Sequence, residues 1–243
     1  MAEPPKLKTP EEWLSEANGV PNPYEKLKLT LTAIESSDKY LDSNNTKGVG
    51  TPDNQWDAYN KLGKMPAQML QKGAGKSLTI EQRLELFDRL DFIRGNSRET
   101  PTDIILNAIS LLSTGARWPG SEKLQEKVLP LLVLEFTQHG AGLESESTRK
   151  MAKNYLDFAF KPENIRLFSK EALDGARAEL RKDIIIQERK KSFYLGEPTS
   201  PQNDNYIKNC QERIDTRESY VKAIESEVER RGSMAKLRQP AGF

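Results

Sequence analysis

The sequence predicts an all-α protein, with a multi-helix body followed by a long C-terminal helical hairpin of the coiled-coil type. Three observations support this. A proline-containing helix-start motif recurs along the chain, and the apolar residues between these motifs repeat every three or four positions. Charged residues make up 30% of the chain and aromatic residues 7%, a balance that suits amphipathic helices with long solvated faces.

The helix-start motif is a small polar residue, then proline, then an acid or amide within a few positions. The polar side chain accepts a free N–H of the first turn, proline has no N–H to lose there, and the acid interacts with the positive end of the helix dipole. Thr79 with Gln82 is a capping box without proline. The proline motifs are Thr9-Pro10, Asn22-Pro23, Thr51-Pro52, Thr100-Pro101 and Ser200-Pro201. Six such starts leave little room for a sheet.

The apolar spacing between the starts is helical in three consecutive segments. Residues 27–41 and 84–93 each carry one apolar stripe, and Gly95 is the expected end of the second helix. Residues 104–112 are apolar on most sides, as expected of a central helix surrounded by others. Residues 42–55 are expected to be a loop. Pro130 is expected to kink or restart the helix that follows Ser121.

The predicted organisation has three parts: an N-terminal helical arm and linker region over residues 1–75, a central helical core over 76–162, and a C-terminal hairpin with a tail over 163–243. Ser169 opens a long helix that reaches about Tyr194. A short polar turn, 196–201, then leads into the last helix. Two long helices joined by so short a link predict an antiparallel hairpin.

The last helix carries an apolar seam that requires a partner. Its members are Ile207, Cys210, Ile214, Val221, Ile224 and Val228. Arg217 occupies the position where the spacing requires an apolar residue, so its charge is either buried against a carboxylate or lies where the seam opens to solvent. We interpret Arg217 as a specificity device, and Arg217→Leu is then expected to raise the melting temperature.

Composition argues against several classes of protein. The net charge is +1, so no overall field favours nucleic acid, membrane or an acidic substrate. One cysteine, Cys210, and one histidine, His139, exclude a disulfide framework and a Cys/His zinc site within one chain. No metal or other cofactor is expected. With no signal-type start, and with the longest apolar cluster (128–136) too short to cross a bilayer, an intracellular location, cytoplasmic or nuclear, is expected.

No motif for catalysis withstands inspection, so the sequence indicates a protein that is not an enzyme. Gly73-Ala74-Gly75-Lys76-Ser77 resembles the end of a phosphate-binding loop, but Leu70 stands where that motif requires glycine. The preceding residues are not a strand that could deliver such a loop. His139 follows an apolar helix and is interpreted as a helix cap.

Two basic clusters support an alternative function. The first is Arg189, Lys190 and Lys191, followed by Phe193 and Tyr194, which could stack on bases. The second is Arg230, Arg231, Lys236 and Arg238, and an antiparallel hairpin places it at the opposite end from the first. The leading hypothesis is a protein–protein interaction or assembly subunit, an adaptor or scaffold, with a protein partner or self-association. The alternative is a structural protein that packages nucleic acid, of the nucleocapsid or capsid kind, through these two basic clusters.

Overall fold

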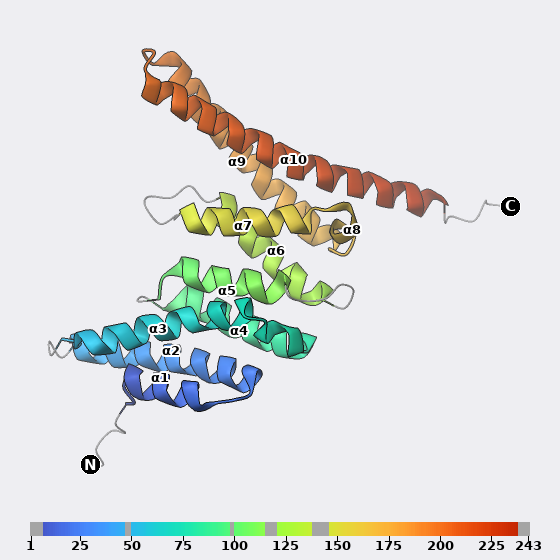
Figure 1. Cartoon of the computed structure of the whole chain (residues 1–243). Coiled ribbons are helices and arrows are strands. Elements are labelled where there is room, and N and C mark those ends of the chain that lie inside the picture. Colours follow the sequence, from blue (N-terminus) through green and yellow to red (C-terminus); the bar gives the residue numbers. More distant parts are fainter. Residues whose placement is uncertain (1–6, 47–49, 98–99, 115–120, 138–145, 238–243) are drawn as a thin grey trace. The chain divides into compact units, whose positions relative to one another are not determined.

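A computed structural model describes residues 7–46, 50–97, 100–114, 121–137 and 146–237. Over these residues it contains ten α-helices, one short 3-10 helix and no strand, which confirms the all-α prediction (Figure 1). The chain divides into two units, Met1–Leu124 and Gln125–Phe243. The three-part division expected from sequence, with boundaries after residues 75 and 162, stays a prediction about which segments fold independently.

Unit 1 is built from five α-helices and the 3-10 helix. Helices α1, α2 and α3 pack against one another, α5 packs against α3 and α4, and α4 also contacts α2. The elements are α1 (Pro10–Gly19), α2 (Pro23–Thr46), α3 (Asp53–Gln71), η1 (Ala74–Ser77), α4 (Ile80–Asn96) and α5 (Thr102–Thr114).

Most of the predicted helix starts have the expected capping bonds. The Thr9 side chain accepts from the Glu12 N–H at 3.3 Å while Glu12 accepts from the Thr9 N–H at 2.7 Å, and Thr79 with Gln82 repeats the pattern. The start of α3 differs, because Pro52 stands at the cap and no side chain bonds there.

Two predicted helix ends were wrong. Helix α2 runs to Thr46, into the expected loop 42–55, and α4 passes Gly95 to end at Asn96. Extending a formed helix through polar residues costs only a few tenths of a kcal/mol each. The fully buried Leu41 anchors the last turns of α2.

Helix α5, which its apolar composition predicted to be a central helix, packs mainly against α3 and α4, whereas α3 contacts α1, α2 and α5. Ile105, Leu106, Ile109 and Leu112 are all fully buried. Within this core the Tyr59 hydroxyl hydrogen-bonds with Asp38 and Thr100, and burial raises its pKa. These contacts tie α2, α3 and the start of α5 together.

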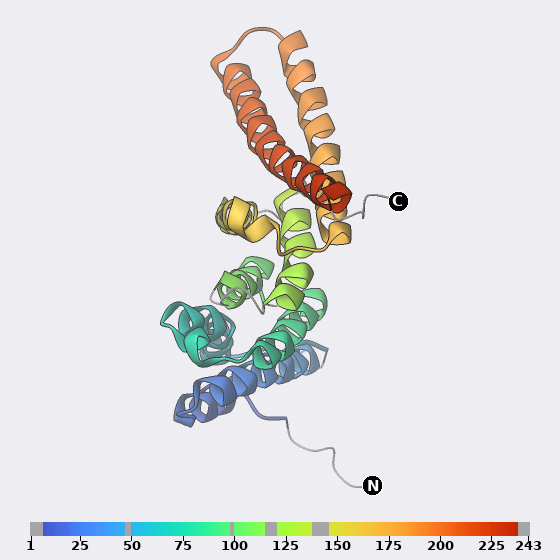
Figure 2. The same cartoon turned by 90° about the vertical axis from the view of Figure 1, so that its right-hand side faces the viewer.

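Unit 2 holds the predicted hairpin. Helices α9 and α10 run antiparallel, side by side, in both views (Figures 1 and 2). The elements are α6 (Glu122–Thr137), α7 (Glu146–Ala159), α8 (Pro162–Ile165), α9 (Lys170–Gly196) and α10 (Pro201–Leu237). Helix α6 is not restarted at Pro130, which lies exposed, so the carbonyl group that it leaves unpaired can be solvated.

The core of unit 2 combines residues from α6, α7 and α9. Val128, Leu132, Leu156 and Leu180 are fully buried. Ser169 caps α9 by accepting from the Ala172 N–H at 3.1 Å, and Ser200 accepts from the Asn203 N–H at the same distance at the start of α10. The hairpin is therefore capped at the start of both helices.

Candidate interaction surfaces

The predicted seam of α10 lies mostly against the chain's own α9. Cys210, Ile214, Arg217, Val221 and Ile224 are buried, whereas Ile207 and Val228 are half-buried. The spacing did not single out Tyr220 and Glu227, which are buried as well. Most of the partner that the seam requires is thus supplied within the hairpin.

Arg217 adopts the first of the two arrangements expected for it, because its charge is buried against a carboxylate. Arg217 and Asp183 form an ion pair in which their side chains are only 3% and 1% exposed. The guanidinium also donates to the carbonyl oxygen of Phe136 at 3.2 Å and lies 4.4 Å from the centre of its ring. Burial lowers the pKa of Arg217, while the charge of Asp183 opposes this shift.

Two members of the second basic cluster bind acceptors of the chain itself. Arg230 and Arg231 each bind Glu227 at 2.7 Å, and the bond from Arg230 lowers the pKa of this carboxyl group. Arg231 also donates to the carbonyl oxygens of Arg166 (3.0 Å) and Phe168 (2.8 Å). Nothing is described for the Lys236 side chain or for Arg238, which lie outside the described residues. Arg231 in particular holds the turn before α9.

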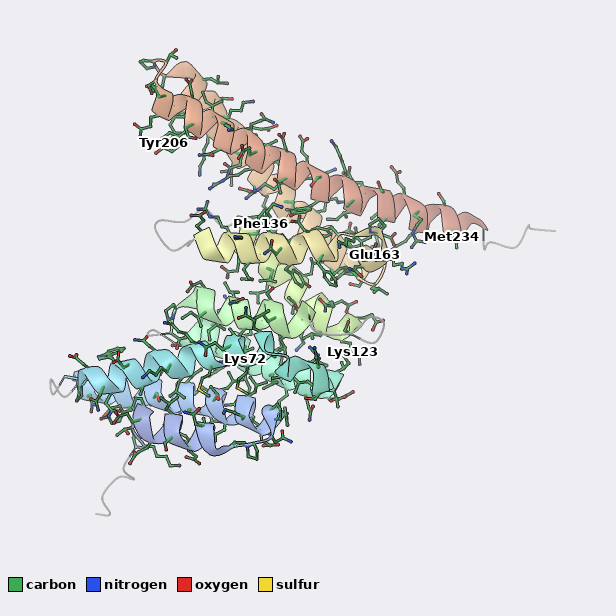
Figure 3. All side chains as sticks on the ribbon, in the orientation of Figure 1. Lys72, Lys123, Phe136, Glu163, Tyr206 and Met234 are labelled. Carbon is green, nitrogen blue, oxygen red and sulfur yellow. The ribbon has the colours of Figure 1, made fainter. Side chains whose placement is uncertain are left out.

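The first basic cluster lies near the turn of the hairpin, beside aromatic side chains. Arg189 and Lys190 are exposed, and Lys191 donates to Gln211 at 2.5 Å. Tyr194 and Tyr206 stack, with ring centres 4.8 Å apart and planes inclined by 10°. Figure 3 shows Tyr206 at the turn and Met234 toward the other end of α10. The two basic clusters are therefore at opposite ends of the hairpin.

Two adjoining hollows lie on one flank of unit 2 and share Asn209 and Arg213. The first, of about 580 Å³, lies between α7 and α10, with Phe136 of α6 also in its wall. The second, of about 460 Å³, lies between α9 and α10 near the turn. Together we call them the basic groove, and the cations along it are Arg149, Lys150, Lys153, Arg189, Lys190 and Arg213.

Four of these cations were not predicted from the sequence as part of a site. Arg149, Lys150 and Lys153 follow one another at helical spacing on α7, which is a recognisable local signal. Nothing in the local pattern, however, places α7 beside Arg213 of α10, because that neighbourhood arises only from the packing of unit 2.

A second surface lies on α9, on the side opposite to its buried residues. Ile185 and Ile186 are 49% and 41% exposed, and Phe193 is 63% exposed. The positions along this side are spaced by four, three, four, three and four residues, and all are exposed. We call them the outer stripe of α9: Glu171, Gly175, Ala178, Lys182, Ile185 and Arg189.

The glycine-rich segment 73–77 follows helix α3 and not a strand. The N–H groups of Lys76 and Leu78 bond to the carbonyl oxygens of Gly73 and Gly75, and the Gly75 oxygen also accepts from the buried Arg83. Gly73 has φ +97°, which favours glycine at this turn. The segment serves as a connector in unit 1, and two of its N–H groups, those of Gly73 and Lys76, are already bonded to the carbonyl oxygens of Leu70 and Gly73.

The described part of the chain contains no group of three or more His, Cys, Asp or Glu side chains placed to hold a metal ion. None of its helices is long and apolar enough to cross a bilayer. His139 lies outside the described residues.

Comparison of the chain with protein-family models, curated proteins and solved structures found no match. The surfaces of unit 2 are therefore what point to a function.

Proposed function

We propose that the chain is a non-enzymatic assembly subunit that associates with a second copy of itself through the outer stripe of α9. The observation that carries this proposal is the exposed three-four repeat of that stripe, bordered by the exposed Ile186 and Phe193. Helices pair along three-four repeats of apolar or small side chains, which Gly175, Ala178 and Ile185 supply in the middle of this stripe. Neighbouring large apolar side chains that remain exposed indicate a surface for association.

The order of residues along the stripe favours a second copy as the partner. Its acidic end, Glu171, and its basic end, Arg189, are equally far from residue 180, and so are Gly175 and Ile185. In an antiparallel pair of α9 helices, one register therefore places Glu171 opposite Arg189 and the small Gly175 opposite the large Ile185. Two-fold symmetry repeats each contact, so the surface is complementary to itself.

Gly175 is explained by this arrangement better than by the chain's own packing. A Cβ atom added at Gly175 would meet nothing within 4 Å, so nothing within the chain requires glycine there. Glycine inside a helix costs about 1 kcal/mol relative to alanine. At Gly175 a second helix can approach closely, with Ile185 of the second copy packed over the glycine. This contact offsets the cost of glycine in the helix.

The hairpin is suited to a scaffold because its inner face is already assembled. The seam of α10 and the Arg217–Asp183 pair hold α9 in place, so the stripe is presented on a formed helix and not on a disordered segment. Cys210 is a buried free thiol, in keeping with a reducing compartment. We accordingly propose an intracellular location, cytoplasmic or nuclear.

A charge exchange tests the proposal. Glu171→Arg and Arg189→Glu should each weaken dimerisation several-fold, because two like-charged contacts form in place of two ion pairs of about 0.5 kcal/mol each. The double variant should restore dimerisation, because it exchanges the two partners. Mass measured by light scattering over a concentration series should approach twice 27.5 kDa for the parent and for the double variant.

Lys208→Glu, an equal charge change at an exposed site on α10 outside the stripe, is the matched control and should leave the mass unchanged. A parent protein that remains a monomer at every concentration would refute self-association. A double variant that associates no better than either single variant would refute the antiparallel register.

A further inference from the structure

We infer that the basic groove binds single-stranded nucleic acid, with phosphates along the cations of α7 and α10 and bases against the aromatic side chains near the hairpin turn. This is a second activity, separate from self-association. It involves different residues from the outer stripe, except for Arg189, which belongs to both, and Phe193, which borders both.

The charge of the groove is strongly positive, although the whole chain has a net charge of only +1. Apart from the buried Arg217, six cations and two carboxylates, Glu146 and Glu212, are among its lining residues. Lys153 is also paired with Asp157 at 2.7 Å. The remaining excess of positive charge is local, and phosphate groups are the natural counter-ions for a line of lysines and arginines.

The cations come from three helices and form a path. Arg149 and Lys150 of α7 and Arg213 of α10 line the first hollow, and Arg213 also lines the second. Lys190 of α9 continues the path toward the turn. Along α10 the groove extends from Tyr206 to Thr216, which is about 15 Å at 1.5 Å per residue. That length corresponds to about four phosphate spacings in a stacked strand.

The aromatic end of the groove favours a single strand over a duplex. Tyr206 is 42% exposed and stacks on Tyr194, and Phe193, which is 63% exposed, packs its ring edgewise on Tyr194. Exposed ring surfaces of this kind can stack with unpaired bases, whereas the bases of a duplex are already stacked on one another. An anionic membrane surface would use the cations but would have no need of a stacking platform inside a hollow.

Fluorescence anisotropy on the whole chain tests the inference. The probes are fluorescein-labelled 20-nucleotide oligouridylate and oligothymidylate, titrated at several salt concentrations. Lys150→Gln with Lys190→Gln should lower the slope of log affinity against log salt by about 1.4, because each phosphate contact to a single strand contributes about 0.7. Tyr206→Leu should weaken binding while leaving that slope unchanged, because it removes stacking and no charge.

The matched control is Lys208→Gln with Lys222→Gln, which removes two exposed charges of α10 that do not line the groove. It should leave both affinity and salt slope at the parent values. The groove variants should also leave the light-scattering mass of the free protein unchanged, so a failure of self-association and a failure of nucleic-acid binding can be told apart.

Three results would overturn the inference. The first is no saturable binding of either oligonucleotide at 50 mM salt. The second is an equal loss of affinity in the groove variants and in the control variants. The third is competition by a 20-base-pair duplex, polyglutamate or phosphatidylserine vesicles as strong as that by unlabelled oligonucleotide, which would identify a general anion-binding surface.

Discussion

Arg217 is the residue for which the structure changes an expectation most clearly. Its position in the seam indicated a charge that costs stability, so that leucine should stabilise the hairpin. In the structure the guanidinium is the partner of the buried Asp183 and a donor to the Phe136 carbonyl oxygen. Removing it would take away the ion-pair partner that Arg217 gives the buried Asp183 carboxylate, which costs more than the added apolar contact contributes.

We now expect Arg217→Leu to destabilise the protein by about 3–5 kcal/mol, opposite in sign to the expectation from sequence. Arg217→Leu combined with Asp183→Leu should recover most of that loss, because both charges of the buried pair are then removed together. Thermal or urea unfolding of the three proteins measures both effects, and Lys222→Leu, at an exposed site on the same helix, should change stability little. A stabilised single variant would show that the pair is not formed.

The basic clusters also show that the role of a charged residue depends on the groups that surround it in the fold. Arg230 and Arg231 were predicted as a patch for nucleic acid, but they bind Glu227, and Arg231 also binds two carbonyl oxygens. Lysine and arginine can be counted from a sequence. Glu227 lies three and four residues before Arg230 and Arg231 on the same helix, but the carbonyl groups that Arg231 also binds belong to a segment more than sixty residues away, which only folding brings near.

Helix α9 has an inner face that packs on α10 and an exposed outer face for which we propose self-association. Only the inner face was anticipated from the sequence as part of a helix pair. The inner face packs on the predicted seam of α10. The outer stripe was missed because it mixes charge, small residues and isoleucine, so its repeat has no uniformly apolar character. A repeat of that kind can be recognised only once the exposed side of the helix is known.

Gly175→Ala separates the stability of α9 from its association. Alanine should raise the unfolding free energy of the monomer by about 0.5–1 kcal/mol, since the added methyl group meets nothing within the chain. The same methyl group should weaken self-association, because it occupies the space into which Ile185 of the second copy packs. Thermal unfolding at low concentration and light scattering at high concentration measure the two effects.

Gly232→Ala is the matched control, because Gly232 is also an exposed glycine within a helix, and a Cβ atom there would also meet nothing within 4 Å. It should stabilise the monomer to a similar extent and leave association unchanged. If Gly175→Ala associates as strongly as the parent, the outer stripe is not in close contact with another helix.

At the scale of the whole molecule, local signals predicted the helices and the hairpin better than they predicted the surfaces. Capping residues such as Thr9, Thr79 and Ser169 act within one turn, so their effect can be read from neighbouring residues. The division into units 1–124 and 125–243 and the groove between α7 and α10 depend on contacts between distant segments. The spacing of the seam predicted that the last helix needs a partner, and the short turn before it predicted that the preceding long helix lies alongside it.

The central claim, antiparallel self-association through α9, is tested most directly by distances between spin labels in two copies. Labels are attached to cysteines at Arg181 or Ser192, both exposed and outside the stripe, in a Cys210→Ala background. With the register centred on residue 180, equivalent labels at Arg181 should lie within about 25 Å of each other. Labels at Ser192 should be offset along the helix axis by about 36 Å, since they are displaced in opposite directions at 1.5 Å per residue. Similar short distances at both sites would show parallel pairing, and the lack of any defined intermolecular distance would show that the chain does not associate through this helix.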